Sequence, residues 1–170
     1  GAVKETADQA KVEIVCGDTK VVEHGKGDQI YINTCGIGFL KRNMQASYQE
    51  GDLVVVSGSI GRHGAAVYMA REDIPLQGNL FSDCALLCKE AVAAMDLPGL
   101  RILRDPTRGG LATTCIELIE HTKWGMELDE TGIPVDADVS ALCSLLGFDP
   151  LYMACEGRMI AIISPQDAPL

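Results

Sequence analysis

The pattern of hydrophobic and polar positions divides the chain into short strands and amphipathic helices. The opening residues are polar and predict a helix, and an apolar run at 12–16 follows them. From 18 to 40 the pattern predicts two strands joined by a Gly-rich hairpin around Gly25–Asp28. The polar residues 41–50 predict a linker.

The rest of the chain mixes strands and helices without a strict strand–helix–strand alternation. The continuous apolar run in 51–60 predicts a strand buried on both faces. Helical spacing is clearest in 82–95, where Ser82 or Asp83 is the expected N-cap. The order of elements favours an α/β or α+β sandwich with a mixed sheet. Its other predicted elements are a helix at 61–71, a strand from about 100, a helix from the turn at 105–110 to about 121, a strand at 126–130, a helix at 137–146 closed by Gly147, and one or two strands within 151–164 that turn at Glu156-Gly157.

Composition and charge exclude several classes of partner. The chain has 170 residues, of which 47% are hydrophobic, so it suits one domain or a domain with a piece of another. Its formal net charge of -10 predicts a surface that repels nucleic acid and anionic lipid. It contains no apolar run of about 18 residues and no signal-peptide pattern. The sequence therefore predicts a cytoplasmic protein with no nucleic-acid or membrane partner.

Seven cysteines are scattered along the chain, and none forms a C-x-x-C pair. This favours reduced, buried thiols over a disulfide framework. Cys84 and Cys88 lie four residues apart on a predicted helix and so share a face. They could hold a metal ion, but the lack of a second ligand pair favours a core role.

Arg108, Gly109 and Gly110 lie in the first turn of a predicted helix, for which Asp105 or Thr107 is the expected N-cap. Glycine in a helix costs about 0.5–1 kcal/mol relative to alanine, so the pair must serve a purpose. One alternative is close packing on a neighbouring strand. The other is anion binding at the positive helix end, with Arg108 adding a charge-assisted hydrogen bond.

The segment “RDPTRGGLATT” resembles the signature of the HypE family of hydrogenase maturation factors. Further segments follow in that family's order: “GDTKVV”, “INTCGIG”, “SDCALL”, “GMELDETGIP” and “LLGFDPLYMACEG”. The resemblance covers nearly the whole chain. It implies the fold of the aminoimidazole ribonucleotide synthetase superfamily, with residues 1–44 as the last part of an N-terminal ATP-binding domain. Residues 45–170 would form most of the C-terminal domain.

Proteins of this family carry a carbamoyl group on the thiol of a C-terminal cysteine. ATP activates the amide oxygen by phosphorylation, and loss of phosphate and of the amide protons gives a thiocyanate, the source of the cyanide ligand of the NiFe site. The resemblance therefore implies an ATP-dependent carbamoyl dehydratase that uses ATP and Mg²⁺. It also implies a homodimer, the carbamoyltransferase HypF and the HypC–HypD iron-assembly scaffold as partners.

The resemblance assigns roles to particular residues. Asp18 and Thr19, in “GDTK”, would approach ATP, with Asp18 as a Mg²⁺ ligand, and the alternative is an ordinary turn. Lys20 would stabilise charge on the activated amide or accept a proton, unless it is a solvated surface lysine. Glu156 would act as a base, unless it is a simple turn residue. The glycine turn at Arg108 would bind the phosphates of the nucleotide.

Two positions depart from the family's wording. Arg62 stands where the family usually has Asp in “GDHG”, which is expected to alter a surface contact. Cys155 stands where Asn usually precedes Glu156, and its sulfur is the weaker hydrogen-bonding group. His24 and His63 are interpreted as structural or surface residues, and His121 lies near the end of a predicted helix, where its charge is favourable.

The remaining elements of the family would lie outside the chain. Its ATP-binding elements rich in Gly and Asp would precede Gly1, and its acceptor cysteine would follow Leu170. The chain is therefore interpreted as a fragment that does not turn over by itself. Two other functions stay open. One is a non-catalytic docking module for the carbamoyltransferase and the scaffold. The other is another ATP-dependent amide-activating synthetase of the superfamily, against which “GDTKVV” and “DPTRGG” argue.

Overall fold

The computed structural model describes residues 1–27, 29–44, 47–72 and 80–168. Its contacts form two compact units, Gly1–Asn43 and Met44–Leu170. The assignment of the first unit to an ATP-binding domain stays a prediction. No helix within the described ranges is both long and apolar enough to cross a membrane.

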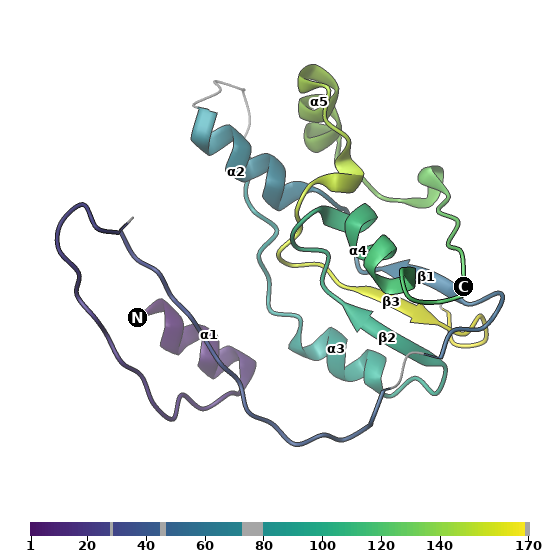
Figure 1. Ribbon diagram of the computed structural model, residues 1–170, viewed down its shortest axis with the longest axis horizontal. Coiled ribbons are helices and arrows are strands. Elements are labelled where there is room, and N and C mark those ends of the chain that lie inside the picture. Colours follow the sequence, from purple (N-terminus) through teal and green to yellow (C-terminus); the bar gives the residue numbers. More distant parts are fainter. Residues whose placement is uncertain (28, 45–46, 73–79, 169–170) are drawn as a thin grey trace. The chain divides into compact units, whose positions relative to one another are not determined.

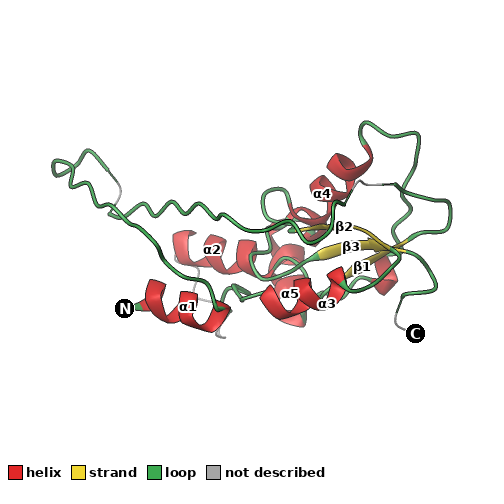
Figure 2. Cartoon of the chain, turned by 90° about the horizontal axis from the view of Figure 1, so that it is seen from below, coloured by secondary structure: helices red, strands yellow, loops and turns green. Residues whose placement is uncertain are grey.

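Among its described residues the first unit contains one helix, α1 (Ala2–Ala10), as its polar opening residues predict. The helix ends at Lys11, whose left-handed backbone directs its N–H to carbonyls of the last turn. Figure 2 draws the chain after α1 as loop, and its described residues up to Asn43 form no strand. A turn lies at 24–27, while Asp28, at the end of the predicted hairpin, lies outside the described residues.

The two predicted strands of the first unit are therefore not formed, although their apolar pattern is clear. Val21 is 89% exposed and Phe39 is 102% exposed. A strand becomes stable when a neighbour accepts its backbone hydrogen bonds and a second layer covers its apolar face. The described part of this unit supplies neither.

The second unit is built on a sheet of β1 (Leu53–Val56), β2 (Leu100–Arg104) and β3 (Ile160–Ile163), in the order β1-β3-β2. Both pairings are antiparallel. The α+β class is confirmed, but the described strands do not mix parallel and antiparallel pairs. Strand β3 lies between β1 and β2 and runs opposite to both, so β1 and β2 run in the same direction.

One helix covers the sheet and a helix pair packs beside it. Helix α4 (Gly110–Ile119) lies over the sheet in Figure 1 and shares a core cluster with it, made of Ile60, Leu111, Cys115, Cys155 and Ile160. Helices α2 (Arg62–Glu72) and α5 (Ala137–Leu146) pack together around a second cluster, made of Ala65, Val139, Leu142 and Cys143. Helix α3 (Cys88–Met95) lies near β2. Short 3-10 turns occur at Glu130–Gly132 and Pro150–Tyr152.

Several local predictions were wrong in detail. The helix predicted from Ser82 begins only at Cys88, because the expected cap Asp83 uses its carboxylate in a distant contact. Helix α4 has Gly109 as its N-cap, with a left-handed φ of 74° and no side-chain cap bond, instead of Asp105 or Thr107. Strand β1 is half-buried, not buried on both faces.

The predicted strand at 126–130 does not form a ladder in the described structure. Met126 and Leu128 instead pack against the first core cluster without forming regular secondary structure. The apolar side chains of this segment are thus partly buried, although its backbone pairs with no strand among the described residues.

Candidate active site

Glu156 lies on the turn that leads into β3, and the segment that contains Asp83 packs against this turn. The Glu156 N–H donates to Asp83 Oδ1 at 3.0 Å, and Asp83 is only 7% exposed. Gly157 has no room for a side chain, since an added Cβ would overlap the backbone carbonyl of Asp83. The backbone at Gly157 therefore packs against the backbone at Asp83, and this contact fixes the position of the Glu156 Cα from which the side chain extends.

His63, on the first turn of α2, faces the Glu156 carboxylate. Its Nε2 lies 4.0 Å from Glu156 Oε1, with side-chain exposures of 26% and 39%. Its Nδ1 lies 2.8 Å from Ser82 Oγ. A carboxylate and an imidazole at this separation can exchange a proton through one bridging water. Sequence reasoning treated His63 as a structural or surface residue, because nothing in the sequence pairs it with a residue so far along the chain.

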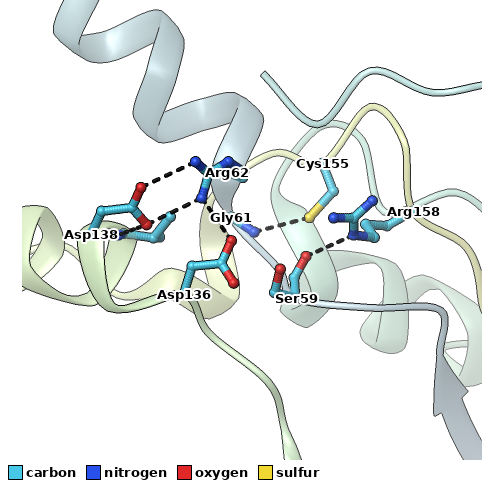
Figure 3. A network of polar contacts seen from close by, with 8 residues as sticks. Ser59, Gly61, Arg62, Asp136, Asp138, Cys155 and Arg158 are labelled. Atoms are coloured by element: carbon cyan, nitrogen blue, oxygen red, sulfur yellow. Dashed lines mark hydrogen bonds and ion pairs between the residues drawn. The ribbon is translucent and has the colours of Figure 1, made fainter. Parts of the chain in front are cut away.

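Arg62 joins the starts of α2 and α5, as Figure 3 shows. Its guanidinium donates to Asp136 Oδ2 at 2.7 Å and pairs with Asp138 Oδ2 at 3.1 Å. The hydrogen bond that Arg62 donates to Asp136 is the largest of the effects that raise the pKa of Arg62. The departure at Arg62 thus produces an ion pair within the unit, where the sequence suggested an altered surface contact.

Cys155 is a buried hydrogen-bond acceptor next to Glu156. Its Sγ accepts the Gly61 N–H at 3.1 Å, and this contact appears in Figure 3 beside the Arg158–Ser59 bond. Burial raises the pKa of the Cys155 thiol, so it stays neutral at physiological pH. The sulfur supports the α2 start from inside the core and does not face a reacting group.

The two glycines of α4 differ in their surroundings. Gly110 is buried, and an added Cβ would lie 2.6 Å from the carbonyl oxygens of Leu151 and Met153. Its N–H donates to the Thr107 carbonyl at 3.3 Å. These contacts support the close-packing alternative for Gly110. Arg108 is exposed, and a phosphate-binding role for Arg108, Gly109 and Gly110 stays a prediction.

The other predicted site residues belong to the first unit. Asp18, Thr19 and Lys20 are all exposed, and Asp18 Oδ1 accepts the Thr19 N–H at 2.8 Å. The roles of Asp18, Thr19 and Lys20 toward ATP, Mg²⁺ and the activated amide stay predictions. The structure brings Glu156 together with His63, Ser82 and Asp83, none of which was predicted for the site.

The cysteines are free thiols, and three of them are buried: Cys115, Cys143 and Cys155. Cys84 and Cys88 do not share a helix face, because α3 begins at Cys88. Over the described ranges, no group of three or more His, Cys, Asp or Glu side chains could hold a metal ion.

This fold and its turn before β3 match a known family. Residues 49–170 match the family described as “AIR synthase related protein, C-terminal domain”. The chain belongs to this family. The matched range contains the sheet, the four helices of the second unit and the Glu156 site.

Within the family the chain is similar to HypE proteins, which confirms the resemblance drawn from its motifs. It is 47% identical to the carbamoyl dehydratase HypE of Cupriavidus necator over 167 residues, covering 95% of this chain and 47% of that protein. A chain of the crystallised HypE–HypF complex superposes with a TM-score of 0.88 and 34% identity, covering 98% of this chain and 56% of the other. HypE in complex with ATP gives 0.82 and 34% identity, covering 96% of this chain and 50% of that one. The chain spans about half the length of the curated relatives it matches.

Proposed function

We propose that this chain serves hydrogenase maturation as part of an ATP-dependent carbamoyl dehydratase. The reaction converts an S-carbamoyl cysteine to a thiocyanate and supplies the cyanide ligand of the NiFe site. The observation that carries the proposal is the Glu156 carboxylate, whose Oε1 lies 4.0 Å from His63 Nε2, on a turn where the Glu156 backbone N–H donates to Asp83. Dehydration of an amide requires removal of two protons, and this pair offers one acceptor and a second group to receive the proton from it.

The remaining residues take supporting roles in the proposed reaction. When bound, ATP supplies the phosphoryl group that turns the amide oxygen into a leaving group. Asp18 would hold Mg²⁺ through one carboxylate oxygen, with Thr19 beside the nucleotide. Lys20 stabilises charge on the activated amide. Arg108, Gly109 and Gly110 would bind phosphate. At Gly110 one side of the turn is packed against other backbone, so the phosphate would approach the opposite side.

The proposed partners follow from the same similarity. HypF, the carbamoyltransferase, is the first, because a HypE–HypF complex has been solved for a similar protein. The HypC–HypD scaffold, a homodimer and a cytoplasmic location complete the proposal.

Titration calorimetry of the 170-residue chain with ATP and Mg²⁺ tests the nucleotide part. We expect binding that is lost in Asp18→Asn, because the neutral amide is a poor Mg²⁺ ligand. Asp8→Asn is the matched control, since Asp8 is an exposed carboxylate of the same unit that pairs with Lys4. The same titration with all three proteins separates loss of the site from a general effect of charge.

A docking function is the second candidate, and the exposed apolar side chains of the first unit favour it. They include Val15 at 87%, Ile37 at 101% and Phe39 at 102% exposure. Absence of ATP binding in wild type and variants alike, together with retention of HypF on the immobilised chain, would replace the catalytic proposal with this one.

A further inference from the structure

Cys84 lies in a polar cluster with Ser82 and His63, next to Glu156. The Ser82 hydroxyl donates to Cys84 Sγ at 3.1 Å, and Ser82 Oγ lies 2.8 Å from His63 Nδ1. Cys84 Sγ itself is 3.9 Å from His63 Nδ1. The opposite ring nitrogen, Nε2, faces Glu156 Oε1 at 4.0 Å. The order thiol, imidazole, carboxylate is that of a nucleophile, its base and the group that orients the base.

The segment that carries Cys84 is held rigidly, although the thiol is exposed. Asp83, its neighbour, is buried and bonds the Glu156 N–H, while Gly157 lies against the Asp83 backbone. The Cys84 N–H donates to Ser82 Oγ at 3.1 Å, which fixes the turn that presents the thiol. A solvent-accessible sulfur on a fixed turn beside an imidazole is the arrangement of a reactive cysteine.

One further group points to an unfilled interaction at this place. Asp83 Oδ2 is buried and has no hydrogen-bond partner among the described residues. A buried carboxylate oxygen without a donor is costly, so a hydrogen-bond donor that reached it would be stabilised. The orphan oxygen lies on the residue directly before Cys84.

We infer that Cys84 is a nucleophilic thiol that takes the acyl group of a thioester. His63 accepts the thiol proton through Nδ1, which lies 3.9 Å from the sulfur, and Glu156 positions the ring from its far side. The general class of electrophile follows from the Cys–His–Glu arrangement. The choice of an S-carbamoyl group within that class rests on the proposed function.

The step balances without any additional reactant. The Cys84 sulfur attacks the carbonyl carbon of R–S–C(=O)–NH₂, a new S–C bond forms, and the bond from carbon to the R–S sulfur breaks. The proton removed from Cys84 by His63 passes to the leaving thiolate, giving R–SH and S-carbamoyl Cys84. One thiocarbamate replaces another, so the exchange is close to thermoneutral.

The chain contains its own controls for a test of thiol reactivity. Cys16, Cys35, Cys84 and Cys88 are all exposed, and only Cys84 has a histidine contact in the described part of the chain. The intact chain is labelled with limiting iodoacetamide and each cysteine is quantified by mass spectrometry. We expect Cys84 to react at least about tenfold faster than Cys88, as activated thiols do. This comparison is made within one folded molecule and needs no variant.

Variants then test the base and the acyl transfer. His63→Gln should slow Cys84 labelling about tenfold and leave Cys88 unchanged, while His121→Gln should alter neither. Incubation with S-carbamoyl-N-acetylcysteamine, without ATP, should place one carbamoyl group on Cys84 and none on Cys84→Ser.

Equal labelling of Cys84 and Cys88 in the wild type would overturn the inference, as would a Cys84 rate that survives His63→Gln. Rapid labelling without carbamoyl transfer would overturn the acyl-acceptor role and leave a reactive thiol. Because no arm uses ATP, these results are independent of whether the nucleotide site of the proposed function exists.

Discussion

The two compact units of the chain use similar apolar patterns with opposite results. In Met44–Leu170 the strand residues Ile160 and Ile162 are 0% and 3% exposed, because β3 pairs on both sides and α4 covers it. In Gly1–Asn43 the equally β-branched Val21 and Ile32 are 89% and 68% exposed. Strand propensity therefore describes a side chain that suits a sheet, and burial follows only where other segments provide the sheet.

The same contrast separates the proposed functional residues. Glu156 and His63 face each other because two packed segments of the second unit hold them. Asp18, Thr19 and Lys20 lie exposed on a loop of the first unit. Residues on such a loop reach a defined geometry only when a ligand or another surface orders them.

Gly157→Val should give the largest effect, because it disrupts the packed segments of the second unit that hold Glu156. Its side chain would overlap the Asp83 carbonyl and force apart the segments that hold Glu156, so we expect a loss of about 4 kcal/mol or more in unfolding free energy. Urea unfolding followed by circular dichroism measures it. Gly125→Ala is the control, since an added Cβ at Gly125 meets nothing within 4 Å. Similar stabilities for the two variants would show that the packed turn is not formed in solution.

Leu142→Ala and Ile14→Ala compare the units directly. Leu142 is 1% exposed in the second core cluster, so its truncation should cost about 2–5 kcal/mol. Ile14 is 57% exposed, so the same kind of truncation should change the unfolding free energy by less than about 0.5 kcal/mol. Both are measured by urea unfolding. A large loss for Ile14→Ala would mean that another surface covers this side chain in solution.

Arg62→Gln should have a smaller effect on the second unit. It removes the pairs with Asp136 and Asp138, whose members are 24–48% exposed, so we expect a loss of about 0.5–1 kcal/mol. The difference should shrink in high salt, where partly exposed charges are screened. Lys89→Gln, an exposed residue of α3, serves as the control. A loss that does not depend on salt would contradict an electrostatic origin.

Asp129 provides the smallest expected effect, which is seen in its titration. The Thr131 hydroxyl donates to Asp129 Oδ1 at 2.7 Å and, as the largest cause, lowers the pKa of that carboxyl. Since the folded-state pKa is lowered, the contribution to stability is present above the unfolded pKa and is lost as pH falls through the folded value. In Thr131→Val the Asp129 carbon resonance should titrate at higher pH, whereas Thr122→Val should leave it unchanged. An identical titration curve in Thr131→Val would contradict this cause.

Elements with local signals were predicted well. Helix α5 spans Ala137–Leu146 as expected, because Gly147 closes it in a left-handed conformation. The family was also predictable, since its motifs are contiguous in sequence. The start of α3 was not, because Asp83 is a good cap in isolation but binds the Glu156 N–H, 73 residues away.

The candidate site shows the same division. Glu156 could be named from its motif, and the apolar runs that became β1 and β3 could be named from their composition. The facing of His63, the burial of Asp83 and the placement of Cys84 depended on contacts between segments that are distant in sequence. Capping and turn preferences act over a few residues, so they can be predicted from a short stretch of sequence. The partners of a side chain are decided by which backbones pack together, and that choice belongs to the tertiary structure.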